Sequence, residues 1–285
     1  MPPPVPYGWL AFGSEGRKEQ TLHTDQDNAL FFSVDTDLNE DESKSWFLTF
    51  SEQVVESLVQ SGIPRCPGGI MASNPQWCQP EERWEARFMG WITEPNPDTL
   101  LKASIFFDFR PIYSGTEFPY ILRERLLRAI RKSRLFMRFM AKIALTNRPP
   151  LGLLKQFVVE KSGEHKNKLD LKMRGLTPVA DAARVLSLSL GITAQNTFDR
   201  IAEINQRGII DDGFYANLRE AYEFIVYLQI TRHLDALAKG EEPNNFLDPA
   251  SLNSLQRKML KESFAVVRRL QETIEFRFQT RVVEM

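Results

Sequence analysis

The sequence predicts an α+β protein in which a small α/β unit is followed by an all-α helical bundle. Up to about residue 115, short apolar runs typical of strands alternate with amphipathic stretches typical of helices. Beyond Gly115 the strand signals stop, and long segments with apolar stripes at helical spacing follow. A chain of 285 residues has room for about two domains, which we place at 1–115 and 116–285.

The first half contains apolar runs rich in aromatic and β-branched side chains, which predict strands. It also contains segments with apolar residues every three or four positions, which predict helices. In chain order, these are a strand at 7–12, a strand at 25–34, a helix at 39–60, a helix at 81–92 and a strand at 104–113. The segment 62–80 is rich in Pro and Gly and is predicted to be a loop.

The second half reads as helices throughout. Thr177-Pro178 is a typical helix start, and Gly191 and Gly240 are typical residues just beyond a helix end. The predicted helices cover residues 117–145, 178–190, 197–206, 212–238 and 251–280.

Two acids near the N-terminus carry the first functional signal. Asp25 and Asp27 open the second predicted strand, and residues two apart in a strand point to the same side. Two carboxylates so close repel each other unless a cation lies between them, and hard divalent cations bind carboxylates together with phosphate oxygens. The Gly13-Ser14 turn upstream is small enough for backbone N–H groups to approach a phosphate.

A third acid, Asp108, lies within the apolar run 104–113. An isolated buried charge is costly, so this carboxylate must be paired, hydrogen-bonded or bound to a metal. Arg110, two residues further on the same face of the predicted strand, is the alternative partner.

These residues resemble a known superfamily. Gly13-Ser14, Asp25-x-Asp27 and a distant Asp108 resemble the nucleotidyltransferases related to DNA polymerase β. The whole string 13–28, GSEGRKEQTLHTDQDN, more specifically resembles a nucleotidyltransferase family often found behind CBS domains in bacterial signalling proteins. That family is related to PII uridylyltransferases and glutamine synthetase adenylyltransferases. The likeness continues through 66–75 and 105–110 and, more loosely, into the helical half.

The resemblance implies a mixed-sheet catalytic domain followed by a helical domain that resembles a substrate-binding domain. It also implies a set of catalytic roles. Asp25 and Asp27 would bind Mg²⁺, or Mn²⁺, bridging the phosphates of a nucleoside triphosphate. Asp108 would complete the metal site and position or deprotonate the attacking hydroxyl. The alternative for Asp25 is a structural cap.

The phosphates would be held by the N-terminal turn. Gly13 and Ser14 would cradle the triphosphate, or else form an ordinary turn. Arg17 would clamp the β- and γ-phosphates, or else form a salt bridge with a neighbouring Glu. Residues that match the family string or lie beside the site, in supporting or direct roles that we leave open, are Glu19, Gln20, Asn28 and Arg110.

Other polar residues rank lower. His23 is interpreted as an ordinary loop residue, Cys66 as part of a loop that borders the nucleotide base, and Asn74 as a loop contact. The basic stretch 165–172 would grip an acidic acceptor or the triphosphate, or else form a solvated face. Gln26 stands where many superfamily members have an apolar residue, so the acceptors of better-known relatives cannot be carried over.

Composition narrows the partners. With 36 Lys and Arg against 37 Asp and Glu, the net charge is −1, which argues against a broad nucleic-acid surface. No apolar run approaches the roughly 20 residues of a membrane span, and no signal-peptide layout opens the chain. Two cysteines without metal spacing suggest a reducing compartment. We therefore expect a cytoplasmic protein with neither a membrane nor a nucleic acid as partner.

The chain starts abruptly, because Met1-Pro2-Pro3-Pro4 leads almost directly into the first strand. Relatives usually carry helices, and often sensory domains, before this point. A fragment, an early-assigned start and a stand-alone version all remain open.

Two classes of function follow. The first is an enzyme that moves a nucleoside monophosphate from a triphosphate to a hydroxyl, on a regulatory protein as in PII uridylyltransferases. The second is a catalytically silent module that senses nucleotides. Retention of all three carboxylates favours the enzyme, because a pure binder can lose one.

Overall fold

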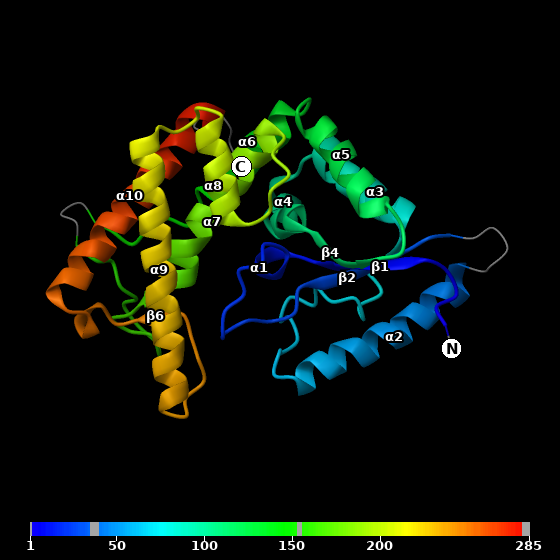
Figure 1. The fold of residues 1–285 in the computed structure, drawn as a ribbon, viewed down its shortest axis with the longest axis horizontal. Coiled ribbons are helices and arrows are strands. Elements are labelled where there is room, and N and C mark those ends of the chain that lie inside the picture. The colour runs from blue at the N-terminus through cyan, green and yellow to red at the C-terminus, as the bar shows by residue number, and fades with distance from the viewer. Residues whose placement is uncertain (1, 35–39, 153–155, 281–285) are drawn as a thin grey trace. The chain divides into compact units, whose positions relative to one another are not determined.

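The computed structural model describes residues 2–34, 40–152 and 156–280 (Figure 1). It divides into two compact units, and Met1–Gln20 with Thr24–Phe136 forms the first. The second consists of Thr21–His23 with Met137–Met285. A mixed sheet with helices in the first unit and mainly helices in the second confirm the α+β prediction.

The first unit is built on a mixed four-stranded sheet in the order β3-β2-β1-β4. Strand β1 pairs antiparallel with β2 and β4, and β2 pairs parallel with β3. The strands are β1 (Tyr7–Ala11), β2 (Asn28–Phe32), β3 (Cys78–Pro80) and β4 (Arg110–Ser114). Every residue of β2 is buried, as expected for a strand with helices on both faces.

Helices cover both faces of this sheet. Helix α2 lies on one side, and α3, α4 and α5 lie on the other (Figure 1). The helices of the unit are α1 (Gly13–Gly16), α2 (Glu40–Gln60), α3 (Glu81–Thr93), α4 (Pro97–Ala103), the 3₁₀ helix η1 (Ser104–Asp108) and α5 (Phe118–Ile130). Residue 39, the predicted first residue of α2, lies outside the described residues.

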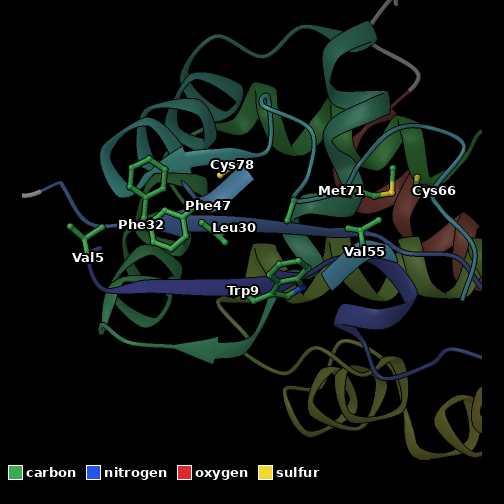
Figure 2. Packing of buried hydrophobic residues seen from close by; sticks show 10 residues of the cluster. Val5, Trp9, Leu30, Phe32, Phe47, Val55, Cys66, Met71 and Cys78 are labelled. Carbon is green, nitrogen blue, oxygen red and sulfur yellow. The ribbon is translucent and has the colours of Figure 1, made fainter. Parts of the chain in front are cut away.

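The core under α2 is largely aromatic. Phe47 and Val55 of α2 pack with Trp9, Leu30 and Phe32 of the sheet (Figure 2). The Phe32 and Phe47 rings stack with their centroids 5.2 Å apart. Such pairs contribute about 0.5–1.5 kcal/mol beyond the area they bury, so this cluster fixes α2 on β1 and β2.

The predicted strand 104–113 was wrong in its first half, because Ser104–Asp108 forms a 3₁₀ helix and only Arg110–Ser114 is strand. An uninterrupted apolar run cannot distinguish a buried strand from a buried helical turn by periodicity. Helix α4, which sequence analysis missed, brings the chain into this run already helical. Its start has a clear signal: the Asn96 side chain accepts hydrogen bonds from two backbone N–H groups, and Pro97 follows.

The single helix predicted at 117–145 is two helices, α5 and α6 (Arg134–Ala144). The break is stabilised by Ser133, whose hydroxyl donates to the Ile92 carbonyl at 2.9 Å and accepts from the Phe136 N–H. Helix α5 belongs to the first unit by its contacts, whereas α6 crosses the division between the units.

The second unit is mainly helical, and its long helices α9 and α10 pack along each other (Figure 1). The elements beyond α6 are β5 (Leu169–Asp170), the π-helix η2 (Lys172–Leu176), α7 (Thr177–Leu190), α8 (Thr197–Gln206), α9 (Asp212–Ala238), β6 (Phe246–Leu247), the 3₁₀ helix η3 (Pro249–Ser251) and α10 (Ser254–Phe278). Pro178 lies in the first turn of α7, and Gly191 ends it in the left-handed conformation, as predicted. Across the described part of the chain, no helix combines the length and apolarity needed to cross a membrane.

Candidate functional site

The two predicted metal ligands converge at the N-terminal end of β2. Asp25 and Asp27 precede the strand, which begins at Asn28, and both are partly exposed. One carboxylate oxygen of each and the Cys66 sulfur all lie within 4.8 Å of one another. We call these three residues the acid cluster.

The residue between the two acids fixes their direction. Gln26 is 1% exposed, and its Nε2 donates to the carbonyls of Val55 and Ile63 at 3.2 and 2.9 Å. Its backbone N–H donates to the Pro64 carbonyl. Neighbouring residues in an extended chain point to opposite sides. Because Gln26 is anchored beneath α2, Asp25 and Asp27 both point away from α2 and lie together beside Cys66.

The Gly13 turn lies directly beside this cluster. Gly13 has a φ of +54°, a conformation that favours glycine, and a Cβ at this position would lie 3.3 Å from Asp27 Oδ2. The Phe12 N–H donates to the Asp27 carbonyl at 2.8 Å. Gly13 and Ser14 open the short helix α1, so the predicted phosphate turn begins next to Asp27, one of the two predicted metal ligands.

Asp108 is fully buried and paired with an arginine, though not with Arg110, the alternative partner that the sequence suggested. Arg17 donates to Asp108 Oδ2 at 2.6 Å and to Glu19 at 2.8 Å. Arg110 instead donates to the backbone carbonyls of Glu15 and Gly16. The alternative Asp108–Arg110 pair assumed a continuous strand, whereas Asp108 ends the 3₁₀ helix η1 and Arg110 begins β4, so the two side chains do not share a face.

The predicted salt bridge between Arg17 and a neighbouring Glu is therefore present, and the same guanidinium also reaches the candidate base. Arg17 and Glu19 side chains are each 12% exposed. The structure does not gather all three carboxylates into one metal cluster, since Asp108 lies against Arg17 and Cys66 takes the third place beside Asp25 and Asp27.

The remaining supporting residues hold loops. Asn28 is 1% exposed and accepts from the Ala72 N–H at 2.9 Å, which fixes the segment that carries Cys66. Asn74 closes the same loop by donating to the Gly69 carbonyl. Gln20 donates to the Thr24 hydroxyl just before the acid cluster. In this structure the Asn28 and Asn74 side chains hold the loop around Cys66, and exposed Gln20 holds the segment just before Asp25.

Sequence analysis missed two residues at the site. A Cβ at Gly16 would overlap the Asp108 carbonyl, so only glycine lets α1 pack against η1. Burial raises the pKa of Glu15 to about 7; the positive charge of Arg110 opposes the shift, and the negative charge of Asp27 adds to it. Both residues lie in the Gly-Ser-x-Gly string, where the second glycine was an available signal.

Cys66 is a neutral neighbour of the two acids. Burial, with the Asp27 charge as a smaller cause, raises the pKa of its thiol to about 11. A protonated thiol is a poor ligand for hard cations, which prefer carboxylate oxygens. The donor chemistry therefore fits Mg²⁺ or Mn²⁺ through Asp25 and Asp27.

Two lower-ranked predictions fall in the second unit. His23 is exposed and lies 6.1 Å from the His233 ring, centroid to centroid. In the basic stretch 165–172, His165 stacks on Phe246 at 3.5 Å, and Lys166 is exposed.

Two family models match the chain. Putative nucleotidyltransferase DUF294 matches residues 1–98, and the Putative nucleotidyltransferase substrate binding domain, DUF294_C, matches residues 134–278. The chain belongs to the DUF294 family. The first match contains the Gly13 turn and both aspartates of the acid cluster, whereas Asp108 lies between the two matched DUF294 regions. No curated protein matches the sequence.

Proposed function

We propose that this DUF294 protein transfers a nucleoside monophosphate, of the uridylyl or adenylyl type, from a nucleoside triphosphate to a hydroxyl group. The observation that carries the proposal is the convergence of Asp25 and Asp27 beside the left-handed Gly13. Two carboxylates that would otherwise repel each other lie next to a turn small enough for a phosphate to approach.

Asp25 and Asp27 would hold the divalent cation, Mg²⁺ or Mn²⁺. When bound, the cation would neutralise charge on the phosphates and orient them. Gly13 and Ser14 would contribute backbone N–H groups and the Ser hydroxyl to the same phosphates.

Asp108 would position the acceptor hydroxyl and take its proton as the hydroxyl oxygen bonds to the α-phosphorus and pyrophosphate leaves. Arg17 orients this carboxylate, because its guanidinium contacts Asp108 at 2.6 Å and balances the charge of a carboxylate that is fully buried. Arg17 also donates through Nε to Glu19 at 2.8 Å, so the guanidinium that orients Asp108 is itself held at a second point. Proton acceptance by a positioned carboxylate typically contributes 10²–10⁴-fold to the rate.

The helical unit would recognise the acceptor. The match of residues 134–278 to a substrate-binding domain supports this division of labour. A hydroxyl on a regulatory protein is the acceptor we favour, from the resemblance to PII uridylyltransferases. The competing function is a silent nucleotide sensor, which the retention of Asp25, Asp27 and Asp108 disfavours.

Label transfer tests the proposal. The purified protein is incubated with each α-³²P-labelled nucleoside triphosphate and Mg²⁺ or Mn²⁺ in a cell extract, and labelled macromolecules are separated. We expect one or few labelled acceptors with the wild type and none with the Asp25→Asn, Asp27→Asn double variant. Nucleotide binding without label transfer under any of these conditions would instead identify the sensor.

A further inference from the structure

The first unit contains a cavity of about 740 Å³ that the proposed metal chemistry does not use. It lies where α3 and α4 meet the loop that follows Cys66. This volume is within the range of roughly 300–1,000 Å³ that small-molecule sites occupy. Residues that line it include Gly68, Ile70, Trp77, Trp91, Lys102 and Phe106. We call it the tryptophan pocket.

The walls of the tryptophan pocket are aromatic. The rings of Trp77 and Phe106 have centroids 4.6 Å apart, and those of Trp91 and Phe106 lie 5.3 Å apart. Phe106 is buried, whereas both tryptophans are partly exposed. Two partly exposed indoles around a buried ring offer flat faces to a planar ligand.

The pocket also has a fixed cation. The Arg87 guanidinium lies 4.9 Å from the Trp77 ring centroid and donates to the Gln76 carbonyl at 2.8 Å. Burial lowers the pKa of Arg87. Lys102, Asp98 and Thr99 add polar groups to the lining. Aromatic faces with a few polar groups suit a heteroaromatic ring that carries its own donors and acceptors.

Two connections tie this pocket to the acid cluster. Cys66 belongs to the cluster, and Gly68 and Ile70, two and four residues later, line the pocket. On the other side, a Cβ at Gly13 would lie 3.3 Å from Asp27 Oδ2 and 3.9 Å from the Ile105 Cβ, next to the lining residue Phe106. Gly13 therefore lies close both to Asp27 and to Ile105, the sequence neighbour of a lining residue.

We propose that the tryptophan pocket binds the base of the nucleotide whose phosphates are held at Gly13 and the acid cluster. This inference rests on the proposed function and adds the base subsite. Purine nucleotides bind tighter than pyrimidine nucleotides, because a purine presents more ring surface to the aromatic wall and to the Arg87 guanidinium that lies over Trp77. Stacking of a base on aromatic side chains is worth about 1–3 kcal/mol, or roughly 5–150-fold in affinity.

The test compares ligands that carry a nucleobase with a ligand that has only the phosphates. Binding of ATP, UTP and inorganic tripolyphosphate is measured by titration calorimetry with Ca²⁺, which supports binding without turnover. The blocking variant is Thr99→Trp, which places a large side chain in the pocket from an exposed position on α4. The matched control is Leu101→Trp, on the same helix but 54% exposed and outside the lining.

We expect Thr99→Trp to weaken ATP binding at least about fivefold and to leave tripolyphosphate binding unchanged. Leu101→Trp changes neither, and Trp91→Leu repeats the selective loss by removing a wall. ATP binding that is equal in the wild type and both pocket variants would overturn the base subsite while leaving the proposed function intact. A wild type that binds neither ATP nor tripolyphosphate would overturn both proposals. Tighter binding of UTP than of ATP would overturn the purine preference.

Discussion

Gly16 and Asp108 meet backbone to backbone, and the Asp108 carbonyl occupies the place that a side chain at Gly16 would need. The contact joins α1, which carries the phosphate turn, to η1, which carries the candidate base. Because the obstacle is backbone, it cannot move aside as the end of a flexible side chain would.

Gly16→Ala is therefore expected to destabilise the first unit by about 1–3 kcal/mol, the usual cost of overpacking, and to lower activity by displacing Asp108. Denaturant unfolding and label transfer measure the two effects. The control is Gly90→Ala in α3, where a Cβ meets nothing within 4 Å. That change should raise stability by about 0.5–1 kcal/mol. Equal effects from both variants would show that the Gly16 contact has no special role.

Asp27→Asn removes one charge from the acid cluster. We expect nucleotidyl transfer to be abolished, while metal-free stability stays level or rises because repulsion with Asp25 is relieved. Thermal unfolding with and without Mg²⁺ and ATP measures this. The wild type should gain stability from the ligands by mass action, and the variant should not. Wild-type transfer rates in the variant would refute the metal assignment.

Asp108→Asn distinguishes the structural role of this carboxylate, its ion pair with Arg17, from its proposed role as proton acceptor. It leaves Arg17 without its buried anionic partner, although Glu19 still accepts from the same guanidinium, so we expect some loss of stability. Triphosphate affinity should stay within about tenfold, or roughly 1.4 kcal/mol, while turnover falls by orders of magnitude because the proton is accepted in the transition state. Specific activity per folded molecule is the decisive measurement. If it is unchanged, Asp108 is purely structural.

Glu15 is expected to make stability depend on pH. Its pKa rises from 4.5 to about 7 in the folded state, with burial as the main cause. Between these values the native state holds a proton that the unfolded chain has lost, so the free energy of unfolding falls as pH rises from about 4.5 to about 7.

The test is Glu15→Gln in the metal-free protein, because a bound cation would change the field around this carboxyl. The substitution should stabilise the protein more at pH 8 than at pH 5, measured by urea unfolding. Glu56→Gln on the exposed face of α2 is the control. A stabilisation that does not vary with pH would show that the Glu15 carboxyl titrates normally.

The sequence predicts those parts of this site that follow from local patterns along the chain. Asp25 and Asp27 were predicted to converge because alternation along an extended chain is a local rule. Local rules also located most helices, through Pro178, Gly191 and the apolar stripes. They failed at 104–108, where an apolar run is compatible with either a strand or a helical turn and the preceding helix decides.

The pairing of Arg17 with Asp108 joins residues 91 positions apart, and no local pattern specifies it. Arg110 was the nearer choice in sequence and the wrong one. The tryptophan pocket has the same origin: its walls come from three separate segments, the predicted loop 62–80, the helix α3 and the stretch 98–106, and no local pattern brings them together. Contacts between residues so far apart in the sequence can be identified only from the three-dimensional structure.

The Arg17–Asp108 pair also bears on how members of this family are compared. Arg17 lies in the segment matched by the first family model, while Asp108 lies in the stretch between residues 98 and 134 that neither model covers. A relative could thus match both models and still lack the candidate base. Loss of that acid alone would leave a guanidinium that is only 12% exposed with Glu19 as its remaining acidic partner, so positions 17 and 108 are expected to change together during evolution. The pair of residues at positions 17 and 108 would then distinguish catalytic from silent members of the family, which a match to the two family models does not.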